Sequence, residues 1–125
     1  WWVETGSKDG AIVKAIEFDG IFCGVIGVYT QELEYAHSGE VGYWLDQAFW
    51  GKGITTQALI EFCDDLFNNT NMVRLYAPVF APNEGSKRVL TKAGFELEGV
   101  FKKAIYKDNC YFDEYRFAKL APGLA

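Results

Sequence analysis

Two glycines separated by one lysine stand just before a predicted helix, and they are well suited to bind an anion. The run reads Trp50-Gly51-Lys52-Gly53-Ile54-Thr55-Thr56. Glycine lets the backbone approach a ligand closely, and free amide N–H groups at a helix N-terminus favour a phosphate. The spacing of a Walker loop and the third glycine of a dinucleotide-binding loop are both absent from it. Taken alone, the run is equally typical of a tight turn in which Thr55 or Thr56 caps the helix.

The sequence indicates neither a metal site nor a nucleophilic thiol. His37 is the only histidine, and it stands in a loop outside any His/Cys cluster. Cys23, Cys63 and Cys110 form no CxxC pair, and their places in apolar runs are typical of reduced, buried thiols. We therefore expect no metal, and a cytoplasmic location for the protein.

The length of the chain indicates the number of domains, and its net charge indicates which kinds of binding partner are expected. A chain of 125 residues that is 50% hydrophobic is long enough for one buried core, so residues 1–125 are expected to form a single domain. The formal net charge of -5 disfavours a nucleic-acid partner and favours cationic amines or basic peptides. The chain lacks an apolar run of ~18 residues, so no membrane partner is expected.

The elements that must position the glycine loop begin with three β-rich runs. Residues 13–18 and 21–30 are separated by Asp19-Gly20, a dipeptide that tolerates the positive φ angles of a tight hairpin turn. Residues 40–45 form a third predicted strand, with alternate apolar side chains on one side. This strand leads directly into the loop.

Two amphipathic helices follow. Apolar residues recur at three- and four-residue spacing through residues 58–67, which predicts a helix from about Thr56. The second helix is expected from about Glu84, with Asn83 as its N-cap and Gly94 just past its end.

Three more predicted strands complete the order β-β-β-α-β-α-β-β. Residues 72–79 form a buried run between the two helices, and residues 95–106 and 110–120 flank a turn at Asp108-Asn109. The succession predicts an α/β domain with a mixed sheet.

Several separately placed motifs resemble the GNAT superfamily, particularly its RimJ/RimL-like ribosomal-protein N-acetyltransferases. They are Gly42-Tyr43-Trp44-Leu45, the loop Trp50-Gly51-Lys52-Gly53, Asn83-Glu84-Gly85-Ser86, Val89-Leu90-Thr91-Lys92-Ala93-Gly94-Phe95 and Glu98-Gly99. The resemblance covers residues 15–120. It implies an α/β fold with a mixed, mostly antiparallel sheet that is splayed at its centre and flanked by helices.

The resemblance also implies a site for acetyl-CoA. The pyrophosphate would lie on the amides of Gly51, Lys52, Gly53, Ile54, Thr55 and Thr56. The pantetheine arm would pair with the strand at Tyr43, Trp44 and Leu45, and it would contact Asn83 and Ser86. Asn83 alternatively serves only as a helix cap.

The chemistry of acetyl transfer needs a base, because an alkylammonium with a pKa near ~10 is not a nucleophile at neutral pH. By resemblance, Glu40 is the general base; the alternative is a solvated carboxylate at a strand end. Many family members protonate the departing thiolate with a tyrosine where Leu90 stands here. Ser86 takes that role by resemblance, and its alternative is a first-turn serine that caps the helix.

Besides Leu90, the sequence departs from the superfamily pattern at the start of the loop, where Trp50 stands in place of the usual Gln or Arg, and in two further places. Thr55 stands where Gly or Ala is usual, which adds a β-carbon beside the phosphates. The chain also carries almost none of the strand and two helices that usually precede the hairpin, so we expect the fold to lack them.

The resulting expectation is an acetyl-CoA-dependent N-acetyltransferase that moves an acetyl group directly to a primary amine. The acceptor would be a protein N-terminal α-amine or a small cationic amine. The alternative is a non-catalytic acetyl-CoA-binding module. The sequence does not fix the oligomeric state and is compatible with a homodimer.

Overall fold

The computed structural model describes residues 2–8 and 10–124 of the chain. It contains a seven-stranded sheet with strand order β1-β2-β3-β4-β5-β7-β6. The elements, in chain order, are β1 (Trp2–Lys8), β2 (Ala11–Phe18), β3 (Ile21–Thr30), the 3₁₀ helix η1 (Leu33–Tyr35), β4 (Ser38–Leu45), the 3₁₀ helix η2 (Gln47–Phe49), α1 (Ile54–Asn69), β5 (Arg74–Phe80), α2 (Glu84–Lys92), β6 (Glu96–Lys107) and β7 (Cys110–Leu120).

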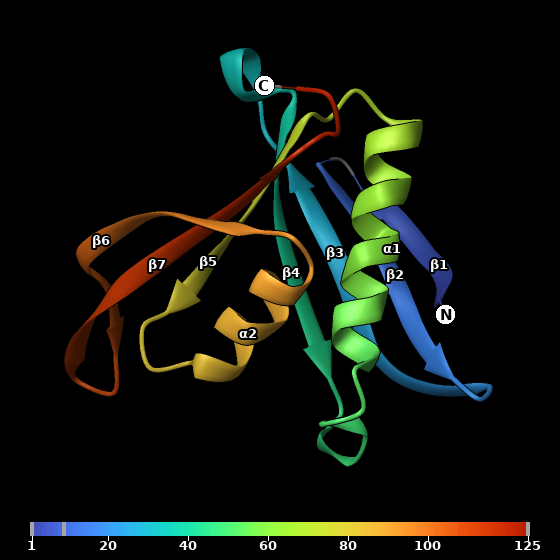
Figure 1. Cartoon of the computed structure of the whole chain (residues 1–125), viewed down its shortest axis with the longest axis horizontal. Helices are drawn as coiled ribbons and strands as arrows, with labels where there is room; N and C mark the ends of the chain where they lie inside the picture. The colour runs from blue at the N-terminus through green and yellow to red at the C-terminus, as the bar shows by residue number, and fades with distance from the viewer. Residues whose placement is uncertain (1, 9, 125) are drawn as a thin grey trace.

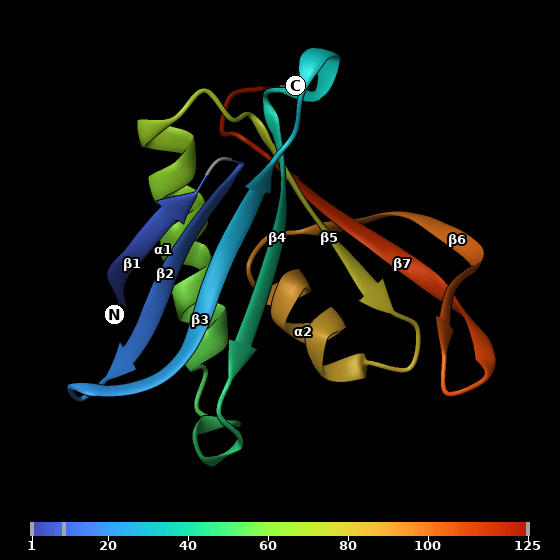
Figure 2. The same cartoon turned by 180° about the vertical axis from the view of Figure 1, so that it is seen from behind.

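The sheet opens at its centre, between β4 and β5. These two strands run parallel, whereas the other neighbouring strands run antiparallel. They pair only from Ser38 to Glu40 on β4 and from Arg74 to Tyr76 on β5, and then separate, as Figure 1 and Figure 2 show. The predicted α/β fold with a mostly antiparallel, splayed sheet is confirmed.

Both helices lie on the same side of the sheet (Figure 1). Burial alternates along β5 as this arrangement requires, because Leu75, Ala77 and Val79 face the helices and are buried while the residues between them are partly exposed. The largest fully buried side chains belong to Ile16, Ile26, Ile54, Leu59, Phe62, Leu66, Leu75 and Leu90. The core therefore fixes α1 and α2 against the two halves of the open sheet.

Both predicted tight turns are present. Asp19 and Gly20 have φ angles of 53° and 78°, and Asp108 and Asn109 have φ angles of 52° and 62°. Two successive residues with positive φ are typical of a type I′ hairpin turn, whose twist matches that of the strands it joins.

The structure corrects three expectations. A strand, β1, does precede the predicted hairpin and pairs with β2 along its length, because backbone pairing outweighs the weak local pattern of a glycine-containing run. Helix α1 begins at Ile54, two residues before the expected Thr56. Cys23 and Cys63 are buried as expected, but Cys110 is exposed because it directly follows the β6–β7 turn.

Candidate functional site

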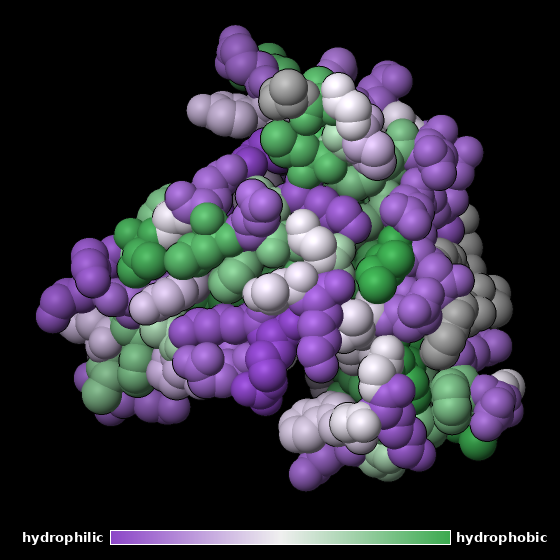
Figure 3. Space-filling model, in the orientation of Figure 1, coloured by the Kyte–Doolittle hydropathy of each residue, from purple (hydrophilic) through white to green (hydrophobic). Residues whose placement is uncertain are grey.

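A cleft of about 620 Å³ opens where the end of β4, the loop after it, the start of α1 and one side of α2 meet. Figure 3 shows the surface hollowed between α2 and this loop. The lining residues are Tyr43, Trp44, Leu45, Phe49, Trp50, Gly51, Gly53, Ile54, Thr55, Thr56, Asn83, Gly85, Ser86, Arg88, Val89 and Lys92. Every residue of the predicted cofactor set except Lys52 is among them. The Lys52 Nζ instead lies 5.8 Å from the centre of the Phe49 ring.

The loop before α1 presents its backbone to the cleft. Gly51 and Gly53 have φ angles of 78° and 73°, which residues with a side chain rarely adopt, and Gly53 is the N-cap of α1. Glycine has no side chain with which to cap the helix, and no other side chain in the described part of the chain makes a capping hydrogen bond there. Thr55 and Thr56 lie inside the first turn, so the alternative in which either threonine is the N-cap is wrong.

This geometry fits an anion. The first amides of a helix have no intrahelical acceptor, and the positive end of the dipole lies beside them. A β-carbon added at Gly51 or Gly53 would meet no atom within 4 Å, so the space in front of the loop is open. The first turn of α1 also contains no acidic side chain that would repel a phosphate.

Trp50 connects the loop before α1 to the sheet through a hydrogen bond. Its indole Nε1 donates a hydrogen bond of 2.8 Å to the carbonyl oxygen of Leu45, the last residue of β4. This contact bridges five residues and holds the end of β4 close to the glycines. It gives a structural role to the tryptophan that opens the loop.

Tyr43 and Ser86 bring two hydroxyl groups together in the cleft. The Tyr43 Oη and the Ser86 Oγ are 2.7 Å apart, which joins β4 to the first turn of α2. Burial raises the pKa of Tyr43, and the hydrogen bond with Ser86 partly opposes that rise. The phenol is therefore protonated at neutral pH, and the pair can donate a proton.

Asn83, rather than Ser86, caps α2. The Asn83 Oδ1 accepts a 3.1 Å hydrogen bond from the Ser86 backbone N–H, so the predicted N-cap is confirmed. The Ser86 hydroxyl does not cap the helix, because it is hydrogen-bonded to the Tyr43 hydroxyl. One turn further along the helix, Leu90 is completely buried in the core, and this position offers no acid to the cleft.

Glu40 lies apart from the cleft residues. It is three residues from Tyr43 on β4, so the two side chains point to opposite faces of the sheet. Its Cα pairs with Tyr29 on β3 and with Tyr76 on β5, and the latter is the last pair before β4 and β5 separate. The structure thus places Glu40 at the opening of the sheet, across β4 from the hydroxyl pair.

Two cations in the cleft were not predicted. Arg88 and Lys92 both line it from α2. They are four residues apart, so they lie on one side of the helix, and this i, i+4 spacing was the signal available in the sequence. Phe49, Gly85 and Val89 also line the cleft without having been predicted, since they carry no distinctive chemistry.

Groups of His, Cys, Asp or Glu that could hold a metal ion do not occur among residues 2–8 and 10–124. His37 is exposed, and its carbonyl oxygen accepts a 2.9 Å hydrogen bond from the Val73 N–H. Neither α1 nor α2 combines the length and apolar character needed to cross a membrane, and the described part of the chain holds no other candidate.

Comparison with known proteins gives concordant matches. Residues 1–96 match the family model of the acetyltransferase (GNAT) domain. The chain is 40% identical over 82 residues to the probable N-acetyltransferase YjcK of Bacillus subtilis (strain 168), covering 66% of this chain and 45% of that protein. It is 31% identical over 83 residues to the ribosomal-protein-serine acetyltransferase of Escherichia coli (strain K12), covering 66% of this chain and 46% of that protein.

A solved structure matches over more of the chain. RimL, a ribosomal L7/L12 alpha-N-protein acetyltransferase in complex with coenzyme A, superposes with a TM-score of 0.83 at 27% identity. The match covers 90% of this chain and 63% of that one. The chain therefore spans between 45% and 63% of the length of these three proteins.

Proposed function

This chain belongs to the acetyltransferase (GNAT) domain family, and from that premise we propose that it is an acetyl-CoA-dependent N-acetyltransferase acting on a primary amine. The observation that carries the proposal is the cleft itself, in which the uncapped start of α1 faces the free edge of β4. The coenzyme A bound to the structurally similar RimL supports the same ligand here.

The described residues offer contacts to both the phosphates and the pantetheine arm of acetyl-CoA. Amides of residues 51–56 and the cations Arg88 and Lys92 offer donors to its phosphates. Within residues 2–8 and 10–124, the edge of β4 that faces β5 has no strand partner beyond Glu40, so residues 43–45 can pair with the amides of the pantetheine arm. The Lys52 side chain is not part of the cleft lining, so we assign its contribution chiefly to its backbone N–H and only a weak, salt-screened attraction to its charge.

Glu40 and the Tyr43–Ser86 pair supply the proton transfers. The amine nitrogen attacks the thioester carbonyl, its proton passes to the Glu40 carboxylate directly or through water, and the carbon–sulfur bond breaks. Ser86 donates its hydroxyl proton to the departing thiolate and takes a proton from Tyr43. Tyr43 is then reprotonated from solvent, to which Glu40 releases the proton that it took from the amine. A backbone N–H on the free edge of β4 stabilises the oxyanion. This direct transfer needs no enzyme nucleophile.

The acceptor we favour is a protein N-terminal α-amine in the cytoplasm. The Escherichia coli relative is a ribosomal-protein-serine acetyltransferase and RimL acts on an alpha-amine of L7/L12, which supports the same class here. The net charge of -5 suits basic protein termini, and it equally suits small cationic amines.

Thiol release from acetyl-CoA tests the proposal. The purified chain is incubated with acetyl-CoA and, separately, a peptide beginning with serine, a peptide beginning with alanine, spermidine and an aminoglycoside. Rapid release with the peptides, and mass spectrometry that places the acetyl group on the α-nitrogen, would support the proposal. Calorimetric binding of acetyl-CoA without release for any amine would instead identify a non-catalytic acetyl-CoA-binding module.

A further inference from the structure

A row of three side chains crosses the face of the sheet that α1 and α2 leave open. Tyr29 of β3, Glu40 of β4 and Tyr76 of β5 are successive Cα partners, so their side chains are neighbours on one face. Tyr29 is 58% exposed, whereas Tyr76 is partly buried. Glu40 therefore stands between an open phenol and an enclosed one.

Two guanidinium groups enclose Tyr76. The Arg74 Cζ lies 5.6 Å from the centre of the Tyr76 ring, and the Arg116 Cζ lies 5.0 Å from it. Both distances are within the range of cation–π contacts. Arg74 precedes Tyr76 by two residues on β5, and Arg116 is the partner of Pro78, two residues after it. The cations thus flank the ring from both directions along the strand.

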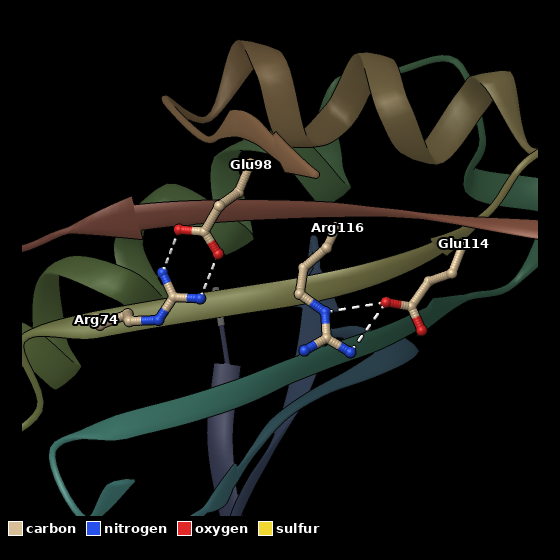
Figure 4. Close-up of polar contacts among 4 residues, drawn as sticks. All are labelled: Arg74, Glu98, Glu114 and Arg116. Carbon is tan, nitrogen blue, oxygen red and sulfur yellow. Dashed lines mark hydrogen bonds and ion pairs between the residues drawn. The ribbon is translucent and has the colours of Figure 1, made fainter. Parts of the chain in front are cut away.

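Each guanidinium is itself held by a carboxylate, as Figure 4 shows. Arg74 makes a two-pronged contact with Glu98, one arm of which is a 2.6 Å hydrogen bond from Nη1. Arg116 donates from Nε to Glu114 at 2.9 Å, and this pair is largely shielded, with the Glu114 side chain 13% exposed. Paired, forked contacts restrict the guanidinium planes and therefore the ring between them.

Burial and the neighbouring Glu40 carboxylate raise the pKa of Tyr76, so its hydroxyl is protonated at neutral pH. Burial makes the largest contribution, and the negative charge of the neighbouring Glu40 adds to it. Arg116 and Arg74 lower it but do not reverse the rise. The phenol can consequently donate a hydrogen bond to the Glu40 carboxylate at neutral pH.

We propose that Tyr76 is the positioning residue for Glu40. The Tyr76 ring is held between Arg74 and Arg116, and its hydroxyl fixes the Glu40 carboxylate at the point where β4 and β5 separate. The inference rests on the proposed function, in which Glu40 accepts the proton of the acceptor amine. A carboxylate held on one side by a fixed donor keeps its other oxygen toward the opening of the sheet, where the reacting amine must arrive. Tyr29, on the other side of Glu40, is 58% exposed, and among the described residues Arg74 and Arg116 make their tyrosine contacts with Tyr76 instead.

Kinetics of Tyr76→Phe measure this role, because the substitution removes the hydroxyl and keeps the ring between the guanidiniums. With the amine that gives the fastest thiol release in the wild type, we expect kcat to fall about 10-fold while KM for acetyl-CoA stays within twofold. In a Glu40→Gln background the same substitution should have almost no further effect, since the two residues act as a unit. Tyr29→Phe, the matched change on the other side of Glu40, should alter kcat less than twofold.

A wild-type kcat in Tyr76→Phe would overturn the proposal. An equal decrease of kcat in Tyr29→Phe would also overturn it, because the contacts of Arg74 and Arg116 with Tyr76 would then make no difference. A third contradicting result would be a decrease of kcat by Tyr76→Phe that is as large in the Glu40→Gln background as in the wild type.

A titration that needs no turnover separates this inference from the proposed function. Tyrosine labelled with ¹³C at the ring carbon that bears the hydroxyl gives one NMR signal per residue, and the signal missing in Tyr76→Phe identifies Tyr76. Because the Glu40 charge raises the Tyr76 pKa, Glu40→Gln should shift its titration to lower pH. An unchanged titration would overturn the contact even in an active enzyme. A shifted titration in a protein that acetylates no amine would leave the contact standing and count against the proposed function alone.

Discussion

The hydroxyl groups of Tyr43 and Ser86 lie 2.7 Å apart and connect the sheet to the second helix inside the cleft. They bring a phenol to the start of α2, although the helix position where many members of the superfamily carry a tyrosine is occupied here by buried Leu90. The acid of the reaction can therefore be assembled from two elements instead of one.

Removing either hydroxyl should slow thiolate departure. Ser86→Ala is expected to lower kcat about 10-fold, and Tyr43→Phe should lower it by a smaller factor, since Ser86 still reaches the sulfur. Steady-state kinetics with calorimetric affinities for acetyl-CoA, which should change less than twofold, check this. A variant that melts at lower temperature but turns over normally would show that the contact only joins α2 to β4.

Glu40→Gln should lower kcat at neutral pH by roughly 10²-fold or more, because an amide cannot accept the proton of the amine. The affinity for acetyl-CoA should stay nearly the same, since Glu40 lies outside the cleft. Raising the pH supplies more unprotonated amine and should recover part of the loss. Near-normal turnover at neutral pH would remove Glu40 from the mechanism.

Local patterns in the sequence predicted most of the fold. Asp19-Gly20 and Asp108-Asn109 each specify their turn through their tolerance of positive φ, and the periodicity of residues 58–67 specifies an amphipathic helix without reference to distant residues. Strand β1 was missed because its stability comes from pairing with β2 and not from its own composition.

The site was predictable only in part, for a similar reason. The glycine loop and Asn83 follow from local spacing, and they line the cleft together. The neighbour relation between Glu40 and Tyr76 depends on the parallel register of β4 and β5, two strands separated in sequence by a loop and α1. The contacts of Arg74 and Arg116 with Tyr76 arise from the same long-range register, which no short motif encodes.

Trp50→Phe should weaken coenzyme A binding by loosening the loop. The substitution keeps an aromatic ring in the cleft but leaves the Leu45 carbonyl without its 2.8 Å indole donor. We expect the Kd for coenzyme A to rise about fivefold, with a small decrease in Tm. An unchanged Kd by calorimetry would mean that the glycines hold their conformation without this hydrogen bond.

Arg88 and Lys92 should discriminate between coenzyme A and dephospho-coenzyme A. Changing either to Gln is expected to weaken coenzyme A binding about fivefold, to affect the ligand with one phosphate fewer less, and to matter less as salt rises. Lys87→Gln is the matched control on the same helix, because the Lys87 Nζ lies over the Tyr115 ring at 3.9 Å and outside the cleft lining. An equal loss for Lys87→Gln would indicate a general effect of charge.

Coenzyme A binding to Gly53→Val tests most directly whether the backbone of the loop holds the pyrophosphate. Valine disfavours the φ of 73° at the N-cap of α1 and places a side chain in the open space before the helix. Lys52→Ala, one residue away, removes only a charge that is not part of the cleft lining, because the Lys52 Nζ lies 5.8 Å from the centre of the Phe49 ring. Calorimetry with coenzyme A and with phosphate-free pantetheine should be run on both variants, with circular dichroism to establish that each is folded. We predict that Gly53→Val loses coenzyme A binding, whereas Lys52→Ala weakens it about fivefold at low salt and less at high salt. Coenzyme A binding to folded Gly53→Val with the wild-type Kd would contradict the assignment of this loop.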